Sequence, residues 1–347
     1  MRQVIIAGAA RTPMGGFQGA LAPLGAPDLG GAAIRAALDD AGGGRVEEVL
    51  MGCVLPAGQG QAPARQAAFL AALGQDVPAT TLNKMCGSGM KAAMLAADQI
   101  ALGRADVVVA GGMESMTNAP YLLPAMRGGA RIGHGQAVDH MFLDGLEDAY
   151  DKGRLMGTFA EDCAERYQLT REAQDDYALA SLSRALQAQD SGAFKAEIAP
   201  VTVRGRSTGT VIDADEQPAR ARPDKIPQLK PAFRPGGTVT AAFSEASTSA
   251  AQKLLDRIGW TTTDVDLWEV NEAFAVVPMV FMRELGLDHG QVNVNGGACA
   301  LGHPIGASGA RIVATLLNAL ERRNLRRSVA AICIGGGEGT AIAIERL

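Results

Sequence analysis

One residue pattern occurs twice in this 347-residue chain, once before residue 115 and once near the C-terminal end. In the first copy, Gly87-Ser88-Gly89 opens an apolar helical stretch, and the strand that follows ends in Gly111-Gly112. In the second copy, Gly306-Ala307-Ser308-Gly309 opens a helical stretch, and the next strand ends in Gly335-Gly336. The repeated pattern predicts two similar halves whose helix starts and strand ends converge at one interface.

Strands and helices alternate in both halves, which is typical of the α/β class. In the first half we expect three strands and three helices: Val4–Ala7, Glu48–Gly52 and Asp106–Ala110, separated by Asp28–Ala41, Ala62–Leu73 and Gly87–Leu102. In the second half we expect two strands and two helices: Leu267–Val270 and Val329–Ile334, with Ala250–Ile258 and Ser308–Arg322. The predicted fold is therefore a layered α/β core of two duplicated βαβαβ-type halves.

The alternation is interrupted between the two halves. A stretch rich in Met, Pro and Gly leads to a charged helix at Thr170–Ser191 and then to basic turns. We therefore divide the chain into an N-terminal half (1–114), an inserted loop domain (115–240) and a C-terminal half (241–347). The basic turns suit phosphate groups, although a solvated face would also carry such charges.

A cysteine at the start of a helix is the first candidate for chemistry. Cys86 lies in Asn83-Lys84-Met85-Cys86-Gly87-Ser88-Gly89, where the N–H groups and dipole of the next helix favour the thiolate form. Gly87 and Gly89 let an acyl group approach closely. Taken alone, such a residue is more often a buried structural cysteine than a nucleophile.

Three clusters near the C-terminus add further candidates: Asn271-Glu272-Ala273-Phe274, Gly302-His303-Pro304-Ile305-Gly306 and Cys333-Ile334-Gly335-Gly336-Gly337. Singly, the histidine could belong to a turn and the asparagine could cap a helix. The glycine run lacks the following Lys and Ser/Thr of a phosphate-binding loop. Together with Cys86, Ala10-Arg11-Thr12-Pro13 and Gly111-Gly112-Met113-Glu114-Ser115, in this order over nearly the whole chain, the clusters resemble the thiolase family.

The resemblance implies a role for each matching residue. Cys86 is the acylated nucleophile, His303 its activating base and Cys333 the second acid/base, while Asn271 holds a water of one oxyanion hole. The backbone N–H groups of Cys86 and Gly335 form the other oxyanion hole. The resemblance also implies substrate and coenzyme A contacts at Arg220, Lys225, Phe233, Ala241, Met156 and Phe274.

These roles fit a reaction that makes or breaks a carbon–carbon bond beside a thioester. A nucleophile takes the acyl group, and a second group near the enolate carbon exchanges a proton at a pKa of about 8.5, as an ordinary thiol does. The resemblance therefore implies an acetyl-CoA acetyltransferase that joins two acetyl-CoA molecules reversibly. It implies coenzyme A thioesters as substrates and no further cofactor.

Three alternatives stay open at this point. A degradative 3-ketoacyl-CoA thiolase would prefer longer substrates, and Leu155-Met156-Gly157 stands where biosynthetic members often have His-Met-Gly. An acyl-carrier-protein condensing synthase would use two histidines with one cysteine, which Cys333 and Asn271 disfavour. A non-catalytic lipid-binding member would be expected to lose Cys86 or His303.

Two departures from the family pattern bear on the fold and the site. After Gly237-Thr238-Val239-Thr240-Ala241 the family continues through a strand, a helix and another strand, whereas this chain reaches the helix at Ala250–Ile258 almost directly. A few dozen residues are missing near 242–249, and we expect an unfilled place in each sheet. Glu338 stands where an uncharged residue is frequent, and we expect it to face outward, since a carboxylate close to Cys333 would raise the pKa of that thiol.

Composition limits the partners. A net charge of −5 and a pI near 5.5 disfavour nucleic acid, and no stretch of about eighteen apolar residues predicts a membrane span. The five scattered cysteines form no CxxC pair, so a metal site is not expected. Without a signal-peptide pattern we expect a cytoplasmic protein, and the resemblance implies a homodimer or homotetramer.

Overall fold

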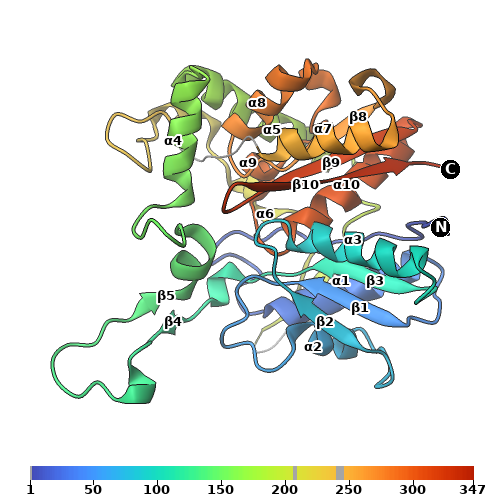
Figure 1. Ribbon diagram of the computed structural model, residues 1–347, viewed down its shortest axis with the longest axis horizontal. Coiled ribbons are helices and arrows are strands. Elements are labelled where there is room, and N and C mark those ends of the chain that lie inside the picture. The colour runs from blue at the N-terminus through green and yellow to red at the C-terminus, as the bar shows by residue number, and fades with distance from the viewer. Residues whose placement is uncertain (1, 206–208, 240–245) are drawn as a thin grey trace.

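The computed structural model describes residues 2–205, 209–239 and 246–347, which form two α/β halves facing each other (Figure 1). The N-terminal sheet is parallel, in the order β2-β1-β3: β1 (Glu48–Gly52), β2 (Ala79–Leu82) and β3 (Val108–Gly112). In the C-terminal sheet, β8 runs parallel and β10 antiparallel to the central β9: β8 (Leu267–Val270), β9 (Arg327–Ile334) and β10 (Glu338–Glu345). The α/β class with two similar halves is confirmed.

Helices form three layers around the two sheets. The helices on the outer face of the N-terminal sheet are α1 (Ala26–Asp40) and α2 (Pro63–Leu70). Those on the outer face of the C-terminal sheet are α7 (Ala246–Ile258) and α8 (Val276–Leu285). Between the sheets lie α3 (Ser88–Ala101) and α10 (Ser308–Arg323), as Figure 1 shows.

The two central helices approach each other closely through equivalent glycines. A Cβ atom on Gly89 would lie 2.7 Å from the backbone nitrogen of Ala310, and one on Gly309 would lie 2.5 Å from that of Met90. Real Cβ atoms do not come so close to backbone, so both positions require glycine. The reciprocal contact brings the starts of α3 and α10 together, and the predicted catalytic groups lie near these starts.

The inserted region wraps around one side of this core. It contains a two-stranded excursion, two helices, a second hairpin and short helical turns: β4 (Tyr121–Leu122), β5 (Val138–Asp139), α4 (Met156–Arg166), α5 (Arg171–Asp190), β6 (Val201–Arg204), β7 (Gly209–Ile212), α6 (Glu216–Arg220) and the 3₁₀ helix η4 (Pro223–Gln228). The β4–β5 excursion extends away from the body (Figure 1). Arg11 joins the insertion to the N-terminal segment through buried ion pairs, 2.6 Å long, to Glu197 and Asp215.

The prediction of a buried strand at Val4–Ala7 is wrong. These residues form no strand, and the side chains of Val4, Ile5 and Ile6 are 37%, 59% and 46% exposed. A strand needs a neighbour for its backbone hydrogen bonds. Within the described residues, β3 pairs with β1 alone and β10 with β9 alone, so each sheet ends in an unpaired edge. Residues 240–245, where the family pattern breaks, lie outside the described residues.

Candidate active site

The loop between β2 and α3 holds Cys86 in a fixed conformation. The backbone N–H of Met85 donates to Asn83 Oδ1 (2.8 Å), and that of Lys84 donates to Ser88 Oγ (2.8 Å). The Ser88 hydroxyl donates in turn to the Met85 carbonyl (2.6 Å). Met85 has a φ of 48°, a left-handed conformation that is uncommon for a residue with a side chain. The surrounding hydrogen bonds stabilise this conformation and so fix the direction of the cysteine.

The resting state of Cys86 is the thiol, contrary to the expectation of a thiolate. Burial raises its pKa to about 11, although hydrogen bonds from the backbone N–H groups of Gly335 and of Cys86 itself lower it. The effect of desolvation on the pKa therefore outweighs the opposite effect of the hydrogen bonds and of the helix N-terminus. The same hydrogen bonds bring together the backbone pair expected to form an oxyanion hole. Because the pKa is raised overall, the predicted role of Cys86 as a nucleophile requires a base to remove its proton.

The surroundings of His303 fit its predicted role as that base. The Ser308 hydroxyl donates to the Pro304 carbonyl (2.9 Å) and lies 2.6 Å from His303 Nδ1. Since that hydroxyl has one proton, we assign Nδ1 as the donor to Ser308 and Nε2 as unprotonated. Nε2 is buried and has no hydrogen-bond partner in the described part of the chain. Burial, together with the positive charge of Arg311, lowers the pKa of His303 to about 4, so the ring is neutral.

Asn271 and Cys333 complete the group. Asn271 directly follows β8 and its Nδ2 lies 3.5 Å from His303 Nδ1, while its buried Oδ1 has no partner among the described residues. Cys333 is the penultimate residue of β9. Burial raises its pKa well above that of an ordinary thiol, and Cys86 lies near enough to raise it further when Cys86 itself is ionised. The four predicted catalytic residues therefore converge.

Glu114 contributes to the site in a way that the motif did not reveal. Its buried carboxylate accepts backbone N–H groups from Val54 (2.9 Å), Leu55 (3.2 Å) and Gly306 (3.0 Å). Gly306 belongs to the loop that carries His303, so Glu114 fixes this loop of the C-terminal half to the N-terminal half. The sequence signal for it is its position two residues after Gly112, the last of the glycines that end β3.

Three of the predicted substrate contacts lie together beside the glycine turn. A Cβ atom on Gly335 would be 3.6 Å from Met156 Sδ. A Cβ atom on the neighbouring Gly157 would lie 2.2 Å from the ring of Phe233. That ring contacts Phe274 edge to face, with the ring centroids 6.1 Å apart. Met156, Phe233 and Phe274 thus form an apolar wall near Cys86.

The other predicted contacts are not part of this wall. Arg220, at the end of α6, is exposed and forms an ion pair with Glu216. Lys225 is exposed in η4. Ala241 lies outside the described residues.

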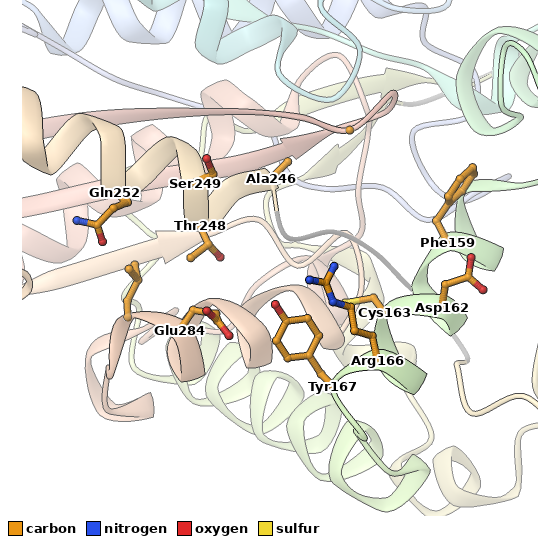
Figure 2. Close-up of a pocket in the computed structure, with 12 residues that line it drawn as sticks. Phe159, Asp162, Cys163, Arg166, Tyr167, Ala246, Thr248, Ser249, Gln252 and Glu284 are labelled. Atoms are coloured by element: carbon orange, nitrogen blue, oxygen red, sulfur yellow. The ribbon is translucent and has the colours of Figure 1, made fainter.

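A cavity of about 680 Å³ opens beside α4 (Figure 2), and its lining residues Cys163 and Tyr167 belong to the same apolar cluster as Phe233 and Phe274. Side chains from α4, from the start of α7 and from the end of α8 surround it, and it extends to Gly337: Phe159, Asp162, Cys163, Arg166, Tyr167, Ala246, Thr248, Ser249, Gln252, Glu284 and Leu285. Its lining therefore combines residues of the inserted region, on α4, with residues of the C-terminal half, on α7 and α8.

Within residues 2–205, 209–239 and 246–347, no group of three or more His, Cys, Asp or Glu side chains is placed to hold a metal ion. None of the helices in these ranges is long and apolar enough to cross a membrane.

The low pKa of His303 predicts a pH-dependent stability. Its pKa is about 4 in the folded protein and about 6.5 when unfolded, so its contribution is complete above pH 6.5 and is lost as the pH falls towards 4. Between pH 7 and pH 4.5 the free energy of unfolding of the wild type should fall by about 2 to 3 kcal/mol more than that of His303→Asn. Urea unfolding of both proteins at the two pH values measures this difference, and equal losses would contradict a neutral buried imidazole.

Comparisons with known proteins agree with this geometry. The family described as "Thiolase, N-terminal domain" matches residues 4–256, and "Thiolase, C-terminal domain" matches residues 231–346. A Pseudomonas aeruginosa acetyl-CoA acetyltransferase is 45% identical over 395 aligned positions that cover 100% of both chains. The Cupriavidus necator acetyl-CoA acetyltransferase is 44% identical over 393 positions with the same coverage, and acetyl-CoA acetyltransferase 2 of Arabidopsis thaliana is 46% identical over 396 positions, covering 100% of this chain and 98% of its own.

Proposed function

The chain belongs to the thiolase family, and from that premise we propose that it is an acetyl-CoA acetyltransferase, which converts two acetyl-CoA molecules reversibly into acetoacetyl-CoA and coenzyme A. The observation that carries the proposal is the convergence of Cys86, His303, Cys333 and Asn271, with the Gly335 N–H directed at the Cys86 sulfur. Both oxyanion donors and both proton-transfer groups expected for this chemistry meet there.

The first half-reaction transfers an acetyl group to Cys86. His303 Nε2 takes the thiol proton as the sulfur attacks the acetyl carbonyl, and the N–H groups of Cys86 and Gly335 stabilise the negative oxygen. The carbon–sulfur bond to coenzyme A then breaks, and the departing thiolate takes the proton from His303. Acetyl-Cys86 remains.

The second half-reaction forms the carbon–carbon bond. Acetylated Cys86 can carry no charge, so the Cys333 thiolate, whose pKa a charged Cys86 would raise, can form beside it. His303 Nε2 takes the proton of the Cys333 thiol, and the Cys333 thiolate then removes a methyl proton from the second acetyl-CoA. The resulting enolate oxygen accepts hydrogen bonds from the protonated His303 Nε2 and from a water held on Asn271, whose Oδ1 has no partner within the described residues. The carbanion attacks acetyl-Cys86, the carbon–sulfur bond to Cys86 breaks, and the departing Cys86 thiolate takes the proton from His303.

The six residues implied by the resemblance would bind the substrate in two parts. Met156, Phe233, Phe274 and Ala241 would contact the acyl and pantetheine groups. Arg220 and Lys225 would face the nucleotide phosphates. We also propose a cytoplasmic homodimer or homotetramer acting in fatty acid metabolism.

Chain-length kinetics test the choice of substrate, which Leu155 in place of the biosynthetic histidine leaves open. Steady-state thiolysis should give a higher kcat/KM for acetoacetyl-CoA than for 3-ketoacyl-CoA substrates of eight to sixteen carbons. A preference for the longer substrates would instead assign the chain to the degradative thiolases.

Stoichiometric labelling tests the nucleophile. Iodoacetamide should inactivate the protein by modifying Cys86, and prior incubation with acetyl-CoA should protect it, because the acetylated sulfur cannot be alkylated. Peptide mass spectrometry identifies the labelled residue. Labelling spread over Cys53, Cys163 and Cys299 with activity retained would show that Cys86 is not the nucleophile.

A further inference from the structure

Glu338 occupies in the C-terminal half the position that Glu114 occupies in the N-terminal half. The segment Gly111-Gly112-Met113-Glu114 includes the last two residues of β3 and the two residues after it. The segment Gly335-Gly336-Gly337-Glu338 connects the end of β9 to the start of β10. Each glutamate is therefore the third residue after the first glycine of its strand-end turn. The duplication makes the two carboxylates counterparts.

Each of the two carboxylates contacts a loop of the other half. Glu114 of the N-terminal half accepts the backbone N–H of Gly306 in the His303 loop. Glu338 of the C-terminal half forms an ion pair with the ammonium group of Lys84 in the Cys86 loop. Gly306 precedes Ser308 at the start of α10 by as many residues as Cys86 precedes Ser88 at the start of α3. The contacts therefore fix equivalent loops, one carrying the base and one carrying the nucleophile.

The position of the Lys84–Glu338 pair relates it directly to the oxyanion donors. Lys84 lies two residues before Cys86, and Glu338 lies three residues after Gly335, whose N–H is directed at the Cys86 sulfur. The intervening Gly336 and Gly337 have φ values of 90° and 79° and no side chains to hold the turn in place. A contact at Glu338 is thus well placed to restrain this turn.

We propose that Lys84 and Glu338 are a positioning pair, which holds the glycine turn against the nucleophile loop so that the Gly335 N–H stays on the Cys86 sulfur. Neither side chain touches the reacting atoms. Glu338 faces solvent, as expected from the sequence, and its charge is compensated by Lys84. The expected effect of this pair on catalysis rests on the proposed acetyl transfer. The expected effect on the reactivity of the Cys86 sulfur does not.

The exposure of the pair sets the size of the effect. The side chains of Lys84 and Glu338 are 37% and 55% exposed, so water and salt screen their attraction. Exposed pairs of this kind typically contribute enough to change an equilibrium or rate by up to about five-fold. The buried counterpart, Glu114, is not a suitable test position, because its loss would leave three backbone N–H groups without an acceptor.

A charge-swap series tests the proposal in the full-length chain. The variants are Glu338→Gln, Lys84→Met, the double variant with both changes, and the swapped Lys84→Glu with Glu338→Lys. Glu345→Gln is the matched control, because Glu345 lies at the other end of β10 and also pairs with exposed arginines, Arg326 and Arg327. For each protein we would measure the single-turnover rate of Cys86 acetylation by acetyl-CoA, the iodoacetamide rate at Cys86, and Tm.

Each single variant should lose about two- to five-fold in both rates with little change in Tm. The double variant should be no slower than the single variants, the swapped pair should recover the lost rate, and Glu345→Gln should match the wild type. Added salt should slow the wild type towards the single variants and leave those variants unchanged. Losses that multiply in the double variant, a swapped pair as slow as the singles, or unchanged rates in the singles would each overturn the proposal. A wild type that is not acetylated would count against the proposed function alone, since the iodoacetamide rates would still decide on the pair.

Discussion

Cys333→Ala is expected to form acetyl-Cys86 at nearly the wild-type rate and yet to lower steady-state turnover by about 100- to 10,000-fold. Acylation needs a nucleophile and a base, whereas carbon–carbon chemistry needs a second group that exchanges a proton with the acetyl methyl group. In the structure, the base His303 donates through Nδ1 to Ser308 and does not depend on Cys333 for its orientation. Rapid-quench measurement of the acetylation burst, beside steady-state thiolysis of acetoacetyl-CoA, separates the two steps.

His303→Ala is the matched variant for this experiment. It should lose the acetylation burst itself, because the Cys86 thiol, with its pKa raised to about 11, then has no neighbouring base. Equal loss of the burst in both variants would show that the roles of the two residues are not divided in this way.

Inserting the residues that the relatives carry beside positions 240–245 is expected to raise Tm by about 5 °C or more. The alignments to the relatives run over 395 and 393 positions and include all 347 residues of this chain, so the relatives contain several dozen residues without a counterpart here. The matches to the two halves of the family also overlap, over residues 231–256. Both findings support an omission near this junction.

The expected gain comes from the two open sheet edges. A restored segment would pair with β3 and β10 and cover the exposed Val4, Ile5 and Ile6, each worth about 1.5 to 3 kcal/mol when fully buried. A total near 5 kcal/mol corresponds to about 7 °C in a chain of 347 residues. A Gly/Ser segment of the same length is the control, since it adds chain but no apolar surface or strand.

Calorimetry of the three proteins gives the answer. The present chain should unfold at a low temperature and the Gly/Ser control no higher. If the present chain melts cooperatively above about 50 °C, thiolyses acetoacetyl-CoA at an ordinary rate and gains nothing from the insertion, the short connection at 243–249 is sufficient and the strands are dispensable.

The sequence was most informative where a segment's own residues determine its environment. The strands Glu48–Gly52 and Leu267–Val270 have the predicted bounds, because both are apolar runs buried between helices. The helix starting at Ser308 also begins where expected. For the site, the motifs named the four residues that converge, and the three motifs of Cys86, His303 and Cys333 combine a reactive side chain with glycines that let the backbone come close.

Features that depend on a distant partner could not be predicted from local pattern. Val4–Ala7 has the composition of a strand but no neighbouring strand to pair with. β10 was missed because its small, half-buried residues show little alternation. The protonation of Cys86 depends on how deeply the other half buries it, and the Lys84–Glu338 pair joins residues 254 positions apart.

The most direct test of the central claim, that Cys86 carries the acetyl group, is mass spectrometry of the chain quenched after mixing with acetyl-CoA alone. One acetyl group should appear, on the peptide that contains Cys86, and it should disappear when coenzyme A is added, because the transfer is reversible. An unmodified Cys86, or an acetyl group on another residue that coenzyme A does not remove, would contradict the account.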